Sequence, residues 1–159
     1  MESTIYYSYM NKCLTQLLGK SPAQDTDKVM GSLLKAADSL EKRLEATLEQ
    51  AGLSGPKWMA LTQLVKAGEP LTLSELAAQL TCVRSNITQL VDRLEADGLV
   101  RRVEDPLDRR SVRAAVTPLG KERQAEGARR VEEVQKELTQ TLSGVDCQAL
   151  QRALSVFSK

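Results

Sequence analysis

Apolar residues recur at steps of three and four positions along two long stretches of the chain, 25–51 and 118–142. This spacing places the apolar side chains in one stripe and the charged ones opposite, so it predicts two long amphipathic helices. Thr117 directly before Pro118 is predicted to cap the start of the second stretch, Ser143-Gly144 ends it, and Asp146 precedes a short final helix. The two stripes consist of Val29, Leu33, Ala37, Leu40, Leu44 and Leu48, and of Ala125, Ala128, Val131, Val134, Leu138 and Leu142.

Three shorter helices are predicted between the long ones. The first follows Ser54-Gly55-Pro56, a start signal with proline near the first turn, and ends near Gly68. The second begins near Leu73, because Thr72 and Glu75 have the spacing of a capping box. The third spans about 83–97 and ends before Gly98, a residue type that closes helices in a left-handed conformation.

Two short strands, 99–103 and 112–116, are predicted after these helices. The loop between them contains proline and aspartates, which favours a turn. Two helices around a tight turn, followed by a hairpin with arginines at its tip, are typical of a winged helix-turn-helix that binds DNA. The fold class expected is therefore mainly α with a small β-hairpin wing.

Composition narrows the function classes. The chain has 159 residues with 22 basic and 21 acidic side chains, so its net charge of +1 gives no general attraction to nucleic acid. DNA affinity has to come from local groups such as the arginines between 101 and 113. The absence of histidine removes the commonest metal ligand and general base, which argues against an enzyme, a metal site or a cofactor.

The location expected from the sequence is the cytoplasm. No apolar run approaches the ~20 residues that cross a bilayer, and the first residues lack the pattern of a signal peptide. The three cysteines, Cys13, Cys82 and Cys147, form neither a disulfide framework nor a metal clip.

The helix predicted at 83–97 carries the candidate base-reading residues. Its apolar residues, such as Ile87 and Leu94, take one face, which leaves a polar face free for the major groove. Amide and hydroxyl side chains can distinguish base pairs there, and arginines can bind phosphate. The candidate DNA-binding residues of this helix are Arg84, Ser85, Asn86, Thr88, Gln89 and Arg93.

The wing supplies the second set of candidates. Arg109 at the hairpin tip is suited to the minor groove, with Arg110 beside it. Asp108 is close enough in sequence to pair with Arg110 or another nearby arginine and hold the loop in shape. Arg101, Arg102 and Arg113 are expected to contact phosphate.

Three motifs in order resemble the MarR family of bacterial transcription regulators: Leu73-Ser74-Glu75-Leu76-Ala77, the stretch 90–100 (LVDRLEADGLV), and Asp105-Pro106-Leu107-Asp108-Arg109-Arg110 followed by Thr117 and Gly120. The resemblance covers about 25–157. It implies a homodimer formed by intertwined N- and C-terminal helices, two recognition helices in successive major grooves, and wings in the flanking minor grooves. It also implies a palindromic operator and release of DNA when a small molecule or an oxidant acts.

The resemblance sets the domain boundaries we expect. Residues 1–24 form an N-terminal extension and 25–159 a single MarR-like domain. Within it, 25–52 and 118–158 are dimerisation helices, and 55–117 is the winged DNA-binding lobe.

Two kinds of signal are compatible with this reading. Trp58 and Met59 could line a pocket for a small aromatic or phenolic effector, although core packing is the commoner role for such residues. Alternatively, Cys82 or Cys13 could sense oxidants in a thiol-based repressor, although Cys82 is also explained as a small buried residue.

Three departures from the family pattern stand beside the match. Thr81, Cys82 and Val83 occupy places where the family usually has glycine, an apolar residue and a serine cap, and Gln89 stands where arginine is common. The N-terminal extension is also longer than usual. The leading function is a sequence-specific repressor of transcription, and the alternative from another class is a winged helix that docks proteins instead of DNA.

Overall fold

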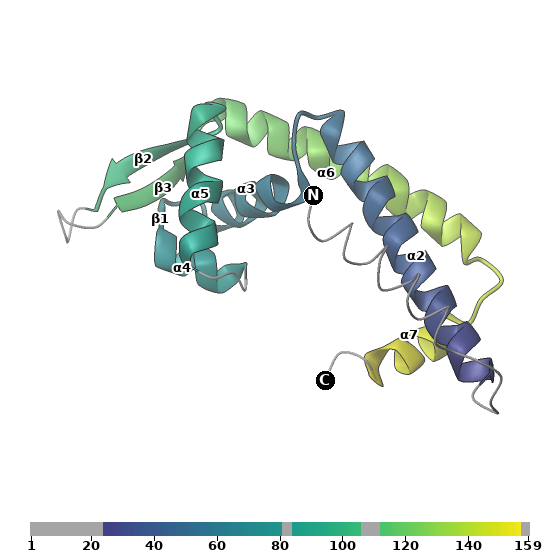
Figure 1. Ribbon diagram of the computed structural model, residues 1–159. Helices are drawn as coiled ribbons and strands as arrows, with labels where there is room; N and C mark the ends of the chain where they lie inside the picture. Colours follow the sequence, from purple (N-terminus) through teal and green to yellow (C-terminus); the bar gives the residue numbers. More distant parts are fainter. Residues whose placement is uncertain (1–23, 81–83, 106–111, 157–159) are drawn as a thin grey trace. The chain divides into compact units, whose positions relative to one another are not determined.

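The computed structural model describes residues 24–80, 84–105 and 112–156 (Figure 1). The chain divides into two compact units, Met1–Ala46 and Thr47–Lys159. Helix α2 (Gln24–Glu49) provides the described part of the first unit, and its last turn belongs to the second. The predicted first long helix is confirmed.

The apolar stripe of α2 is only partly covered. Leu33 and Leu44 are half-buried, whereas Val29 is 55% exposed and Leu40 38% exposed. Burying apolar side chains of this size lowers the free energy, so further packing against the exposed part of the stripe would be stabilising.

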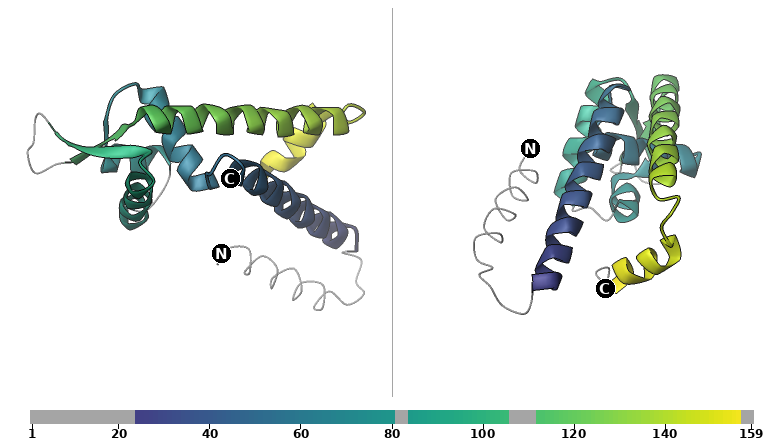
Figure 2. Two further views of the ribbon diagram at one scale, coloured as in Figure 1. Left: turned by 90° about the horizontal axis from the view of Figure 1, so that it is seen from above. Right: turned by 90° about the vertical axis from the view of Figure 1, so that its right-hand side faces the viewer.

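The second unit holds the remaining helices and a small sheet. Figures 1 and 2 show the hairpin of this sheet extending beyond the helices of the same unit. In chain order its elements are α3 (Gly55–Ala67), β1 (Leu71–Thr72), α4 (Leu73–Gln79), α5 (Arg84–Ala96), β2 (Val100–Glu104), β3 (Val112–Val116), α6 (Pro118–Thr141) and α7 (Cys147–Ser155).

The sheet is antiparallel with the strand order β1-β3-β2. Val100 pairs with Val116 and Glu104 with Val112, so the predicted hairpin is confirmed. The sequence missed β1, which has only two residues; Leu71 pairs with Ala114 of β3. A strand this short has no apolar and polar alternation to detect.

Strand β2 begins one residue later than expected, at Val100, because Leu99 completes the end of α5. The backbone N–H of Leu99 donates to the carbonyl of Leu94, and that of Gly98 donates to Glu95, at 2.9 Å each. Gly98 has a φ of +70°, in the left-handed region. These bonds form a Schellman motif, which ends α5 where the sequence predicted.

The core of the second unit joins α3, α4, α5 and the sheet. Its largest fully buried side chains are Leu61, Leu64, Leu76, Ile87, Val91, Leu94 and Val100. Three of them belong to α5 at a helical spacing, so the face of α5 that packs inward is set by the sequence pattern. Its opposite face is therefore turned outward.

Helix α6 starts at a close contact with the base of the wing. Thr117 accepts a hydrogen bond from the Gly120 amide at 3.0 Å, which confirms the predicted cap. Its hydroxyl lies 2.8 Å from the carbonyl oxygen of Gly98. A Cβ atom at Gly120 would lie 2.1 Å from the Leu99 carbonyl oxygen. Glycine is thus required for α6 to begin this close to the turn between α5 and β2.

Candidate nucleic-acid interface

The outward face of α5 is polar. Asn86, Gln89 and Arg93 are exposed and stand three and four positions apart, so they share one side of the helix. Thr88 is exposed as well. Arg84 and Ser85 belong to the first turn of α5, and their side chains lie outside the described part of the structure. The structure thus places three of the predicted base-reading residues together.

These side chains border a hollow beside the first turn of α3. Its volume is about 270 Å³, and it is lined by Pro56, Asn86, Ile87, Gln89, Leu90 and Arg93. The amides of Asn86 and Gln89 both donate and accept hydrogen bonds, and Arg93 is a fixed cation. This is the set of groups that recognises base edges and phosphates in a major groove.

Arg102 ties α5 to the first wing strand. Its backbone N–H donates to Glu95 Oε1 at 2.8 Å, its Nη1 also donates to Glu95, and its Nη2 donates to Asp92 Oδ1 at 2.6 Å. The hydrogen bond from the Arg102 backbone is the main reason that the pKa of Glu95 is lowered. Glu95 in turn raises the pKa of Arg102. We call Arg102, Glu95 and Asp92 the helix-wing brace.

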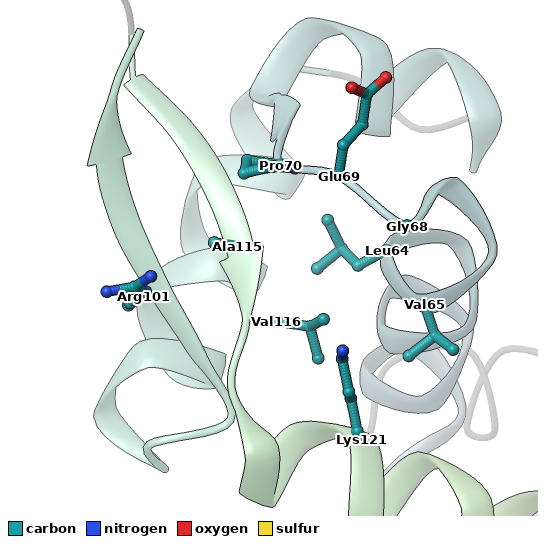
Figure 3. Close-up of a pocket in the computed structure, with 9 residues that line it drawn as sticks. All are labelled: Leu64, Val65, Gly68, Glu69, Pro70, Arg101, Ala115, Val116 and Lys121. Carbon is teal, nitrogen blue, oxygen red and sulfur yellow. The ribbon is translucent and has the colours of Figure 1, made fainter.

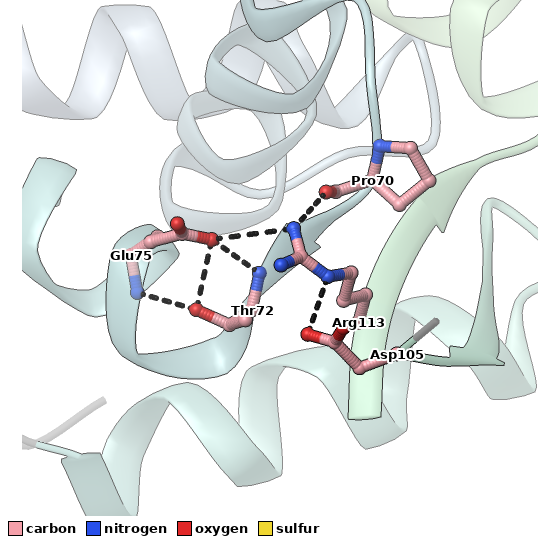
Figure 4. A network of polar contacts seen from close by, with 5 residues as sticks. All are labelled: Pro70, Thr72, Glu75, Asp105 and Arg113. Carbon is pink, nitrogen blue, oxygen red and sulfur yellow. Dashed lines mark hydrogen bonds and ion pairs between the residues drawn. The ribbon is translucent and has the colours of Figure 1, made fainter. Parts of the chain in front are cut away.

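Arg113 ties the second wing strand to α4 (Figure 4). Its Nε donates to Asp105 Oδ2 at 2.7 Å and its Nη1 to the Pro70 carbonyl at 3.1 Å. The same Nη1 lies 3.8 Å from Glu75 Oε2. Asp105 is buried, with its side chain 6% exposed. A charged carboxylate is tolerated there because a guanidinium neutralises it and donates to it.

Glu75 also completes the predicted capping box of α4. Its carboxylate accepts from the Thr72 amide at 2.8 Å, and its own amide donates to Thr72 Oγ1 at 3.2 Å. The hydrogen bond from the Thr72 backbone is the main cause of the lowered pKa of Glu75. The first turn of α4 is therefore connected to the wing through Glu75 and Arg113.

The structure changes the roles expected for two wing arginines. Arg102 and Arg113 were expected to contact phosphate, but both are engaged in ion pairs within the unit. Arg101 is exposed on the same strand as Arg102. Which side chains pair across two strands depends on the strand register, and the pattern of charges in the sequence does not determine that register. The alternation of residues along β2 would have separated Arg101 from Arg102.

The tip of the wing, with Asp108, Arg109 and Arg110, lies outside the described residues. At the base of the wing the buried carboxylate is that of Asp105, which the sequence analysis did not single out. The signal available for it was its position directly after the first wing strand, two residues beyond Val103, which pairs with Arg113.

Trp58 packs where α3 meets α6. Its indole is half-buried, and Nε1 donates to the Gln124 carbonyl at 3.3 Å. A Cβ atom at Gly127 would lie 2.7 Å from Trp58 Cδ1. Met59 is 48% exposed. Neither Trp58 nor Met59 lines the hollow on α5, and their role in an effector pocket stays a prediction.

The cysteine hypothesis concerns residues outside the described ranges, since Cys13 and Cys82 both fall there. Cys147 is described, as an exposed free thiol at the start of α7. Within 24–80, 84–105 and 112–156 no group of metal-ligating side chains is found. No helix in these ranges has the length and apolar character needed to cross a membrane.

Comparison with known proteins identifies this architecture. The profile of the MarR family matches residues 51–111, from the turn before α3 to the wing. YsmB of Bacillus subtilis, an uncharacterized HTH-type transcriptional regulator, is 31% identical over 99 residues, which cover 62% of this chain and 67% of YsmB. The transcriptional repressor IacR of Pseudomonas putida is 31% identical over 119 residues, or 72% of this chain and 68% of IacR.

The chain belongs to the MarR family. It is a DNA-binding transcriptional regulator, and this family consists of regulators, not enzymes. The structure of the repressor CouR bound to a 23-mer DNA duplex has the same fold, with a TM-score of 0.71 and 22% identity over 89% of this chain and 100% of that chain. NadR in complex with 4-hydroxyphenylacetate has a TM-score of 0.58 and 26% identity over 80% of this chain and 90% of that chain.

Helix α5 is the helix that the sequence predicted at 83–97, and its role as the recognition helix stays a prediction. Arg102 and Arg113 belong to neighbouring cross-strand pairs, Arg102–Ala114 and Val103–Arg113, and their ion pairs connect the wing to α5 and α4. The lobe thus presents a helix and a hairpin as one preorganised surface.

Proposed function

We propose that this MarR-family regulator is a homodimeric repressor that reads a palindromic operator with α5 and contacts the flanking minor grooves with its wings. The observation that carries the proposal is the polar face of α5, on which Asn86, Gln89 and Arg93 are exposed while Ile87 and Leu94 are buried behind them. A helix anchored in this way offers its donors and acceptors to base edges without further ordering.

Exposed apolar side chains support the homodimer. Leu138 of α6 is 36% exposed, and Leu150 and Leu154 of α7 are 37% and 39% exposed. Together with Val29 and Leu40 of α2, they belong to the predicted N- and C-terminal dimerisation helices. Burying such side chains against a second copy would contribute about 25 cal/mol per Å² of apolar area removed from water. A two-fold dimer in turn requires a two-fold operator.

The wing is proposed to act through Arg109 and Arg110, with Asp108 holding the loop. The braces at Arg102 and Arg113 support this proposal, because a hairpin fixed at its base loses little further freedom when its tip enters a groove. Arg84 and Ser85, in the first turn of α5, are proposed to contact phosphate and a base edge respectively.

Release by a small aromatic or phenolic effector is the proposed signal. NadR, which shares the fold, was solved with 4-hydroxyphenylacetate, and IacR is named as a repressor. Trp58 and Met59, at the start of α3, are the proposed contacts for the effector of this regulator.

The test is selection of binding sites from random duplexes with the full chain, followed by a promoter reporter that carries the selected site. We expect enrichment of a palindrome with half-sites about 10 base pairs apart. Expression should fall when the regulator is present. Absence of an enriched sequence would contradict DNA reading by α5, and increased expression would contradict repression.

A further inference from the structure

A cavity at the root of the wing has no role in the function described so far. Its volume is about 310 Å³, and it opens where the end of α3, the end of β3 and the first turn of α6 meet. Figure 3 draws its lining residues: Leu64, Val65, Gly68, Glu69, Pro70, Arg101, Ala115, Val116 and Lys121. The volume lies at the low end of the range of about 300–1,000 Å³ that is typical of small-molecule sites.

The lining of the cavity is mixed: five of its side chains are apolar and three are charged. Leu64 and Ala115 are buried, and Val65, Pro70 and Val116 are half-buried. In Figure 3 the side chains of Leu64 and Val116 face the space between α3 and β3. An apolar ring or short alkyl chain placed there would remove apolar surface of both the ligand and the cavity from water, which favours binding.

Two cationic side chains of the lining, Lys121 and Arg101, are available to bind an anion. Lys121 directs its ammonium into the space beside Val116 in Figure 3, and Arg101 lies on β2. Within the part of the chain that the structure describes, neither side chain has a hydrogen-bond or carboxylate partner. Arg102 and Arg113 of the same sheet are both paired with carboxylates. Glu69, the acidic residue of the lining, extends away from Lys121 at the opposite rim.

We propose that this cavity is a binding site for a small carboxylic acid with an apolar body. The carboxylate is held by Lys121, with Arg101 adding positive potential, and the body lies on Leu64, Val65 and Val116. Hydrogen bonds from an ammonium to a carboxylate are about twice as strong as those between neutral groups.

A ligand in this site would contact three elements of the winged lobe at once. Lys121 is one turn after Thr117, whose hydroxyl lies 2.8 Å from the Gly98 carbonyl at the end of α5. The walls come from α3, β3 and α6, so a bound acid holds these three elements together. The binding site itself does not rest on the proposed dimer, on the operator or on a pocket at Trp58.

The test is a titration of the full-length protein with benzoate, followed by ¹H–¹⁵N NMR. Benzoate should cause saturable shifts at the amides of Gly68, Val116 and Lys121. The neutral analogue benzamide should bind more weakly, because it lacks the charge. Inorganic phosphate should also bind more weakly, because it lacks the apolar body.

Lys121→Met removes the cation and keeps the length of the side chain. It should weaken benzoate binding about tenfold, since hydrogen bonds to charged groups are of the size that produces such a change. Lys121→Arg should retain binding. The matched control, Lys66→Met, removes a lysine from α3 that does not line this cavity and should leave the affinity unchanged.

Three results would overturn the site. One is the absence of saturable shifts with benzoate at tens of millimolar. Another is an affinity that is equal in Lys121→Met and the parent protein. The third is a set of shifts centred on Trp58 and Met59 instead of Gly68 and Val116.

Discussion

The guanidinium of Arg113 lies 2.7 Å from the buried carboxylate of Asp105, which joins β3 to the residue that follows β2. Arg113 also donates to the carbonyl of Pro70, ahead of β1. One side chain therefore connects both wing strands and the segment leading into α4. This arrangement makes the base of the wing part of the folded core.

Asp105→Asn should lower the free energy of unfolding by roughly 1–3 kcal/mol, because Arg113 is then left partly buried without its counter-charge. Urea denaturation followed by circular dichroism measures the effect. Glu104→Gln is the matched control, since Glu104 is the exposed neighbouring carboxylate. An equal loss in both variants would show that the Asp105 pair has no special structural role.

Gly127→Ala should destabilise the second unit although alanine is the better helix former. The new Cβ atom would lie 2.7 Å from Trp58 Cδ1 and 3.3 Å from Leu48 Cδ2, both closer than ordinary contact. Overpacking of this kind costs about 1–3 kcal/mol and outweighs the gain of roughly 1 kcal/mol in helix propensity.

Gly31→Ala in α2 provides the control for helix propensity alone, because a Cβ atom there meets nothing within 4 Å. This variant should be stabilised by up to about 1 kcal/mol. Thermal unfolding of both variants distinguishes the cases. A stabilised Gly127→Ala protein would contradict the close packing of Trp58 against α6.

Removing the charge of Glu95 should reduce stability at neutral pH and have little effect in acid. The pKa of Glu95 is held below its ordinary value of 4.5 by hydrogen bonds from Arg102. A lowered folded-state pKa means that unfolding takes up protons. The ionised brace therefore stabilises the fold above about pH 4.5, and the contribution is lost as the pH falls through the folded-state pKa.

Denaturation of the parent protein and of Glu95→Gln between pH 7 and pH 3 measures this dependence. The difference in unfolding free energy should be largest near neutrality and shrink below about pH 4.5. A difference that is independent of pH would assign the effect of the substitution to packing instead of charge.

The elements that the sequence predicted best are those with local signals. Thr72 and Glu75 form the capping box that their spacing indicated, and Gly98 ends α5 in the left-handed conformation. Thr117 likewise caps α6. Each feature depends on residues within four positions of one another, so no knowledge of the tertiary structure was needed.

Contacts between distant residues were not predictable in this way. Arg101, Arg102 and Arg113 look alike in the sequence. Only the register of β2 against β3 and the packing against α5 determine which of these arginines meets a carboxylate. Strand β1 was missed because two residues carry no alternation, and its pairing with β3 is itself a tertiary contact. The cavity at Lys121 depends on the same long-range packing.

If the outward face of α5 reads base sequence, Gln89→Ala should change which bases the regulator prefers. Relative affinities for every single-base variant of the selected operator should be measured with the parent protein, with Gln89→Ala and with Gln135→Ala, an exposed glutamine of α6. Gln89→Ala should lose about 1–3 kcal/mol of discrimination at one base pair of each half-site, and Gln135→Ala should match the parent. Unchanged base preferences in Gln89→Ala, Asn86→Ala and Arg93→Ala alike would contradict base reading by α5.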